Sequence, residues 1–141
     1  MELDLKITIL AMLAQIVLTL WSIVSTGRAR VAVLKHKELH IRDVALSTDA
    51  YPPAVKQLQN NMQNQFETPP IFYAAVILVT ALNIAHWGIA AAAVVYVVLR
   101  VLHRLVHVGS NNVIRRFKLY VAGLAVLTVI WMLVIIEIFR M

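Results

Sequence analysis

The sequence predicts an all-α membrane protein, a bundle of four transmembrane helices that forms one domain of 141 residues. Hydrophobic residues make up 61% of the chain, above the roughly 45 to 50% that is usual in soluble domains. These residues lie in four blocks, each close to the length of a membrane-spanning helix. Such a chain has no room for a soluble catalytic domain as well, so we expect an integral, multi-pass membrane protein.

The first apolar block predicts a span over residues 7–26. The stretch from Ile7 to Val24 would extend about 27 Å at about 1.5 Å per residue, enough to cross a bilayer with little tilt. No small-residue cleavage pattern follows it, so we expect it to remain in the mature protein. Gln15 lies near its middle, and we expect this amide to form an interhelical hydrogen bond.

A basic connection is predicted over residues 27–54, between the first and second spans. Its cations, counted with one at the start of the second span, are Arg28, Arg30, Lys35, Lys37, Arg42 and Lys56. His36 and His40 are spaced as i and i+4, but no carboxylate at ligand spacing accompanies them, so we predict no metal site. The chain has no cysteine. Any thiol chemistry must therefore use a thiol that comes with the substrate.

The second span is predicted over residues 55–84, with a polar first half. Four polar side chains fall within an arc of about 80° on one helix, and we expect this stripe to face a polar partner: Gln57, Asn60, Asn64 and Glu67. Pro69 and Pro70 remove two backbone donors, which predicts a bend right after Glu67.

The third and fourth spans are predicted over residues 88–107 and 117–139. Four side chains near the end of the third span share one face within about 100°: Arg100, His103, Arg104 and His107. The turn between the second and third spans carries no Lys or Arg, whereas the first and third loops are basic. This asymmetry predicts that loops one and three are cytoplasmic and both termini outside, in the inner membrane if the source is bacterial.

The net charge of +6 is assigned to this topology and to contact with anionic membrane lipids, and no nucleic acid partner is predicted. Counted from the uncharged turn, Glu67 and Arg104 lie at about the same depth, roughly 25 Å across. A charge at the bilayer centre costs at least about 2.5 kcal/mol, so we expect Glu67 and Arg100 to point inward and pair. Such a pair would either only join the second and third helices or form part of a ligand site.

Several of these residues together resemble the MAPEG family, the membrane-associated proteins of eicosanoid and glutathione metabolism. The features are four spans, Asn64 one turn before Glu67, Glu67 two residues before Pro-Pro, and the run Arg100-Val101-Leu102-His103. Residues 64–69 look most like the bacterial members. The resemblance implies a homotrimer of four-helix subunits that binds glutathione between subunits, near the cytoplasmic side, and acts on lipophilic small molecules.

The resemblance also implies roles for individual residues. Asn64, Glu67 and His103 would line the glutathione pocket, while Arg100 would brace the second and third helices. Arg104, which lies at the depth of Glu67, is a further candidate for ligand binding. Arg115 or Arg116 would stabilise the thiolate, Arg30 resembles the basic exit of the first helix, and Tyr120 stands near the family's fourth-helix tyrosine. Gln63 and Asn60 occupy positions of family arginines, and His107 that of a tyrosine. Without these two arginines, two charged hydrogen bonds of about 1.5 to 3 kcal/mol each are absent, which would weaken carboxylate binding by about a hundredfold or more.

Three functions follow from these residues. The first is a glutathione-dependent transferase or peroxidase for lipophilic electrophiles, with glutathione as co-substrate and no metal. The second is a non-catalytic lipid-binding or scaffold protein of the same fold, suggested by the missing arginines. The third is a small proton-coupled exporter that uses Glu67, although such exporters place their carboxylate in the first helix, where this chain has Gln15.

Overall fold

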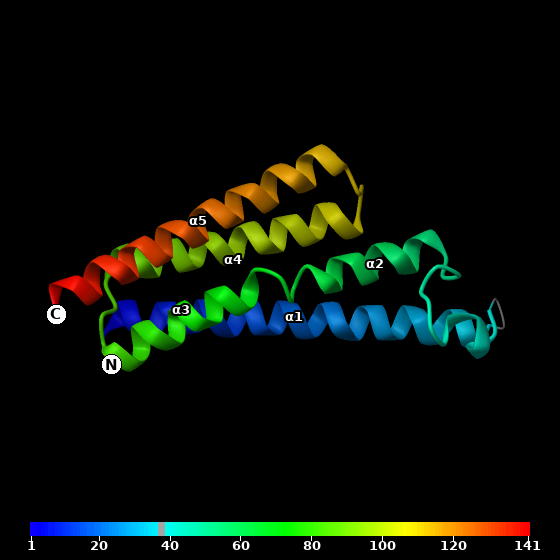
Figure 1. Ribbon diagram of the computed structural model, residues 1–141, viewed down its shortest axis with the longest axis horizontal. Helices are drawn as coiled ribbons and strands as arrows, with labels where there is room; N and C mark the ends of the chain where they lie inside the picture. Colours follow the sequence, from blue (N-terminus) through cyan, green and yellow to red (C-terminus); the bar gives the residue numbers. More distant parts are fainter. Residues whose placement is uncertain (37–38) are drawn as a thin grey trace.

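The computed structural model describes residues 1–36 and 39–141, so that Lys37 of the predicted basic connection lies outside the described residues. The described residues form helices and no strand, which confirms the all-α prediction. The elements are α1 (Leu3–Lys35), a short 3-10 helix η1 (Ile41–Val44), α2 (Pro53–Gln63), α3 (Pro69–Leu82), α4 (Trp87–Val108) and α5 (Val113–Arg140). Both termini lie at one end of the elongated bundle, and the α1–α2 connection and the α4–α5 turn lie at the other (Figure 1). We call this second end the basic end.

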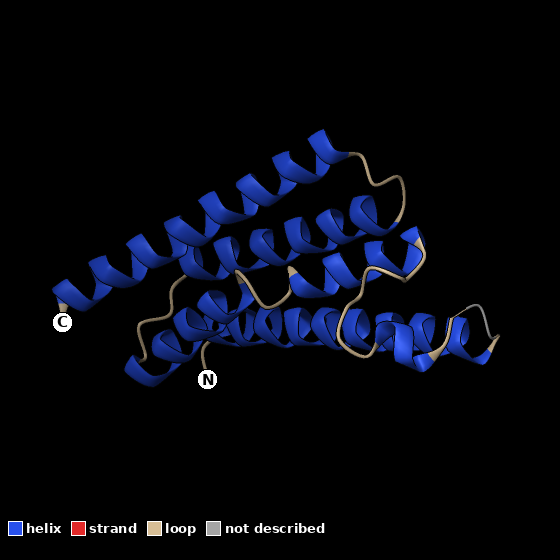
Figure 2. Ribbon diagram, turned by 45° about the vertical axis from the view of Figure 1, so that its right-hand side comes forward, coloured by secondary structure: helices blue, strands red, loops and turns tan. Residues whose placement is uncertain are grey.

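Three helices, α1, α4 and α5, are long and apolar enough to cross a membrane, and α3 is a shorter apolar helix. Figure 2 shows that helices account for most of the bundle, with loops at its ends and one at the α2–α3 junction. Large apolar side chains such as Leu10, Val17 and Leu20 are exposed on α1. The inward seam of the same helix carries polar residues, among them Thr8 and Gln15. This arrangement suits an integral membrane protein, because lipid can cover the apolar exterior.

Helix α1 continues nine residues beyond the predicted span end, to Lys35. Gly27 interrupts the apolar block, but a single glycine costs only about 1 kcal/mol in a helix interior. A small apolar cluster formed by Val33, Tyr51 and Val55 supports the extension. Contact with the α2 segment thus offsets the weak local helix preference.

The predicted second span consists of two helices rather than one bent helix. Residues 64–67 form turns between α2 and α3, and Thr68 is the N-cap residue of α3. Pro69 and Pro70 open α3, where a missing N–H costs nothing because first-turn donors have no intrahelical partner. Arg100 of α4 donates from Nη2 to the backbone oxygen of Asn64 at 2.7 Å. The guanidinium therefore satisfies a carbonyl at the helix break.

The polar stripe predicted on the second span faces a different direction from the one expected. Asn60 and Glu67 are exposed, whereas the neighbouring Asn61, Gln65 and Thr68 are buried. Each buried residue has a polar partner on another helix: Asn61 with Arg104, Gln65 with Gln15, and Thr68 with Tyr96. Periodicity identified a polar helix, but the positions of these partners set its rotation.

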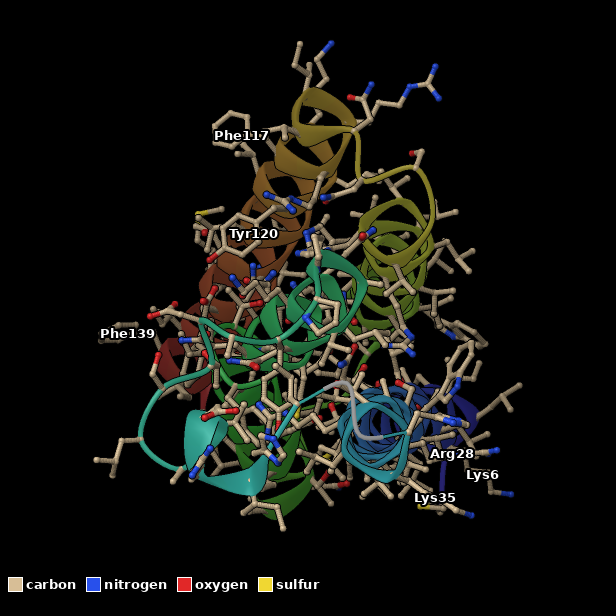
Figure 3. The ribbon with its side chains drawn as sticks, turned by 90° about the vertical axis from the view of Figure 1, so that its right-hand side faces the viewer. Lys6, Arg28, Lys35, Phe117, Tyr120 and Phe139 are labelled. Carbon is tan, nitrogen blue, oxygen red and sulfur yellow. The ribbon has the colours of Figure 1, made fainter. Side chains whose placement is uncertain are left out.

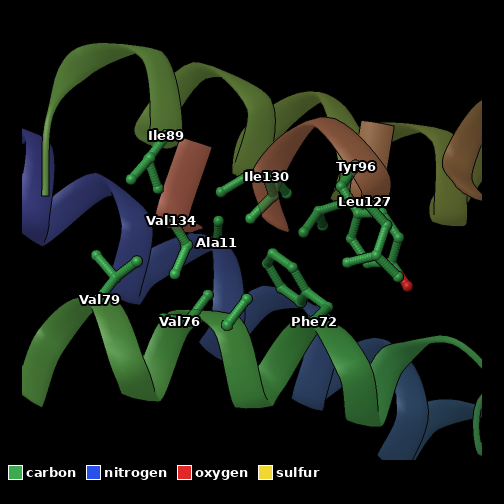
Figure 4. Packing of buried hydrophobic residues seen from close by; sticks show 12 residues of the cluster. Ala11, Phe72, Val76, Val79, Ile89, Tyr96, Leu127, Ile130 and Val134 are labelled. Atoms are coloured by element: carbon green, nitrogen blue, oxygen red, sulfur yellow. The ribbon is translucent and has the colours of Figure 1, made fainter. Parts of the chain in front are cut away.

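An apolar core lies between α3, α4 and α5, and α1 contributes Ala11 to it (Figure 4). Phe72 and Tyr96 are fully buried there, and their ring centroids are 4.5 Å apart. Tyr96 also shares a hydrogen bond of 3.1 Å with Thr68. The core thus holds α3 and α4 together next to the helix break.

The expected interhelical hydrogen bond of Gln15 is confirmed: Nε2 donates to Gln65 Oε1 at 3.0 Å, and Gln15 is fully buried. Replacing Gln15 with leucine should lower the free energy of unfolding by about 1 kcal/mol, since Gln65 would lose its donor. Unfolding in mixed detergent micelles, followed by circular dichroism, measures this change. The double variant with Gln65→Leu should recover part of the loss, because neither amide then remains unpaired. A single variant as stable as the wild type would contradict the prediction.

Candidate functional site

A pocket of about 240 Å³ lies near the basic end, between the α2–α3 junction, α4 and α5. Its lining residues are Asn64, Glu67, His103, Val113, Arg116, Phe117 and Tyr120. The four from α5 follow the i, i+3, i+4, i+7 spacing of a single helix face. Figure 3 looks onto the basic end and shows Phe117 and Tyr120 projecting from α5, on the opposite side of the bundle from Arg28 and Lys35 of α1.

The two candidate arginines are neighbours in the first turn of α5, but they have different surroundings. The side chain of Asn112 caps the helix by accepting from the backbone N–H of Arg115 at 3.0 Å. Arg115 itself is exposed and does not line the pocket. Arg116 is half-buried and lines it, with Nη1 at 2.8 Å from Asn111 Oδ1 and 3.2 Å from His107 Nε2.

Glu67 is exposed at the pocket, and its carboxylate accepts a long hydrogen bond of 3.4 Å from the Tyr120 hydroxyl. The predicted pairing of Glu67 with Arg100 is wrong. Among the described residues, the ion pairs within 4 Å that involve Lys or Arg are Arg42–Asp43 and Arg140–Glu137, and His86 Nε2 lies 3.9 Å from Glu137. Arg100 binds the backbone oxygen of Asn64 instead, because the helix break leaves this strong acceptor beside it.

His103 and His107 lie on the buried face of α4. The His103 ring lies near two others, with its centroid 5.6 Å from that of His107 and 6.1 Å from that of Tyr120. Gln57 of α2 donates to the backbone oxygen of His107 at 2.5 Å. Gln57, which the sequence places in the polar stripe, therefore braces the end of α4 and does not line the pocket.

The structure places Arg104 outside the pocket, at the contact of α1, α2 and α4. Its Nη1 donates to Ser22 Oγ at 2.7 Å and to Asn61 Oδ1 at 2.6 Å, and its Nη2 donates to Ser25 Oγ at 3.0 Å. Its guanidinium carbon lies 4.3 Å from the centroid of the Trp21 ring. These contacts use three of the five N–H donors of Arg104, which therefore holds three helices together.

Three other candidate residues also lie away from the pocket lining. Asn60 and Gln63 are exposed on α2, and Arg30 lies 5.7 Å from the centroid of the Tyr51 ring. Conversely, sequence reasoning missed Val113 and Phe117, the apolar residues of the pocket. Their helical spacing from Tyr120 was the available signal. The described residues contain no group of three or more potential metal ligands.

The fold and the pocket together define an integral membrane protein with a site of polar and apolar side chains near one end of a helical bundle. The chain belongs to the MAPEG family, whose family profile matches residues 8–136. Comparison with curated proteins and comparison with solved structures each gave no match.

Proposed function

We propose that the protein is a glutathione-dependent transferase or peroxidase that acts on lipophilic electrophiles. The observation that carries the proposal is the pocket, where one guanidinium, that of Arg116, lies with Asn64, Glu67, His103 and Tyr120. A permanent cation stabilises a thiolate over a thiol, and a thiolate is the nucleophile that such chemistry requires. Membership of the MAPEG family, which includes glutathione-dependent enzymes, supports the same conclusion.

The pocket offers complementary groups for both reactants. The thiol would give its proton to water, and the resulting thiolate, held by Arg116, would attack the electrophilic carbon and form a C–S bond as the leaving group departs with its electron pair. The carboxylate of Glu67 suits the ammonium group of glutathione. Val113 and Phe117 are exposed apolar residues at the pocket. They provide a surface over which a lipophilic substrate could approach from the bilayer.

The proposal includes a homotrimer, which the family resemblance implies. The exposed surface formed by Asn60 and Gln63 of α2 and by Glu67 of the α2–α3 junction would then lie towards a neighbouring subunit. Asn60 and Gln63 would contribute neutral hydrogen bonds there, in place of the charged hydrogen bonds that arginines would make. The basic end is proposed to be cytoplasmic, because both basic connections lie at this end (Figure 1).

Calorimetric titration of glutathione into the detergent-purified protein tests binding. We expect a dissociation constant between about 1 μM and 1 mM, which corresponds to about −8 to −4 kcal/mol. Glu67→Gln should weaken binding, because the ligand ammonium loses an anionic partner. Lys118→Ala is a matched control, because Lys118 is exposed and lies outside the pocket. No binding at about 10 mM glutathione, roughly tenfold above the weakest constant expected, would contradict the proposal.

A non-catalytic lipid-binding protein is the second candidate function. A groove of about 260 Å³ between α1 and α4 favours it, since apolar residues line this groove, among them Leu10, Ala14, Val94 and Val98. Its apolar lining suits an acyl chain. Lipid that stays bound through purification, together with no affinity for glutathione, would support this function over the enzyme.

A further inference from the structure

His107 has a side-chain contact that the proposed chemistry does not use. Its ring nitrogen Nε2 lies 3.2 Å from Nη1 of Arg116, the cation of the pocket. His107 is 1% exposed, and its other ring nitrogen, Nδ1, has no hydrogen-bond partner. Gln57 of α2 donates a hydrogen bond to the backbone oxygen of His107. The end of α4 is therefore anchored at His107, and the buried ring directs one nitrogen at the guanidinium.

The chemistry of arginine determines which form of the ring makes this contact. A guanidinium has five N–H donors and no acceptor, and it keeps its charge in proteins. His107 Nε2 must therefore be the acceptor, which requires a neutral imidazole with its proton on Nδ1. A protonated ring has donors on both nitrogens and cannot accept from Arg116.

We propose that His107 is a positioning residue, whose neutral imidazole holds the Arg116 guanidinium in the pocket and whose protonation releases it. The effect on turnover rests on the proposed function, in which Arg116 stabilises the thiolate. Only the turnover consequence depends on that function, because the hydrogen bond exists without any ligand.

The groups around His107 favour release of Arg116 over a new contact between Arg116 and the protonated ring. The charged groups near it are Arg116 from α5 and Arg100 from its own helix. His103 is its titratable neighbour on α4, and Gln57 from α2 is uncharged. An imidazolium would therefore face like charges without a carboxylate among these groups. Arg116 would lose its contact with His107 and keep only its bond to Asn111, in the exposed α4–α5 turn.

Two amide substitutions at position 107 test the two ring nitrogens separately, because each places an amide at the position of one of them. The glutamine amide reaches about as far as Nε2, so His107→Gln keeps an acceptor for Arg116 that does not titrate. The asparagine amide reaches only about as far as Nδ1, so His107→Asn does not. Both variants remove the imidazole and place an amide at the same site. They therefore differ mainly in whether Arg116 is held.

The readout is the pH profile of thiol-dependent kcat. In the wild type, kcat should fall as the pH drops and His107 becomes protonated. His107→Gln should keep kcat within about threefold near neutral pH and lose this acid limb. His107→Asn should lower kcat by about 10- to 100-fold, as expected for a misplaced catalytic group. An unchanged acid limb in His107→Gln, or wild-type kcat in His107→Asn, would overturn the inference.

Nitrogen NMR of ¹⁵N-histidine-labelled protein in detergent tests the contact without a substrate. The His107 signal, assigned by its loss in His107→Gln, should show the Nδ1–H tautomer at neutral pH, and Arg116→Ala should remove this preference. An Nε2–H tautomer or a protonated ring at neutral pH would overturn the inference. A wild-type protein with the expected tautomer but no thiol-dependent turnover would overturn the proposed function and leave the His107–Arg116 contact established.

Discussion

Replacing Arg116 with alanine is expected to lower kcat/KM for thiol-dependent conjugation by about 10²- to 10³-fold, the usual loss when one group that stabilises an anion is removed from an active site. Arg116 is the arginine that lines the pocket. Without it, a thiolate would lie beside Glu67 with no cation to offset their repulsion. Product formation from glutathione and 1-chloro-2,4-dinitrobenzene, measured with purified protein, gives the value.

Arg115→Ala is the matched control, since it removes the same charge one residue away. Arg115 is exposed and outside the pocket, so its loss should change kcat/KM by less than about twofold, as for a surface substitution. Arg116→Lys should be intermediate, because a lysine keeps the charge but not the planar set of donors. Equal effects of the two alanine variants would contradict the assignment of Arg116.

Removal of the Arg104 side chain should give the largest loss of stability among substitutions at the basic end. Arg104 is 4% exposed and donates hydrogen bonds to Ser22, Ser25 and Asn61. Interhelical hydrogen bonds in membrane proteins contribute about 0.6 kcal/mol on average and up to about 1.7. The contact with Trp21 adds about 0.5 to 2 kcal/mol. We therefore expect Arg104→Ala to lower the free energy of unfolding by about 2 to 4 kcal/mol.

Unfolding in mixed detergent micelles measures this loss, and two variants serve as controls. Arg28→Ala removes an exposed cation from α1 and should lie within about 0.5 kcal/mol of the wild type. Arg104→Lys should retain only part of the stability, because a lysine cannot reproduce the geometry of the three hydrogen bonds. A loss below about 0.5 kcal/mol for Arg104→Ala, the range of ordinary surface changes, would show that Arg104 does not hold the helices together.

Much of the candidate site could be anticipated from residue types and spacing. Asn64, Glu67, His103 and Tyr120 were each expected near the ligand, and the structure brings them to one pocket. The pairing of Glu67 with Arg100 could not be judged in the same way. Depth along a helix places two charges at one level, but it does not include the carbonyl that a helix break leaves free beside one of them.

The sequence alone was enough to establish a helical membrane protein, the need of Gln15 for a polar partner, and the resemblance to the MAPEG family. Composition, the length of the apolar blocks and the chemistry of single residues can all be read from the linear sequence. Only the tertiary structure decided that Asn61 and Gln65 face inward while Asn60 faces outward, and that Arg116 lines the pocket while Arg115 does not. In a membrane, lipid and protein core are equally apolar, so hydrophobicity does not set the rotation of a helix. Specific polar partners on neighbouring helices set it, and their positions exist only in the folded bundle.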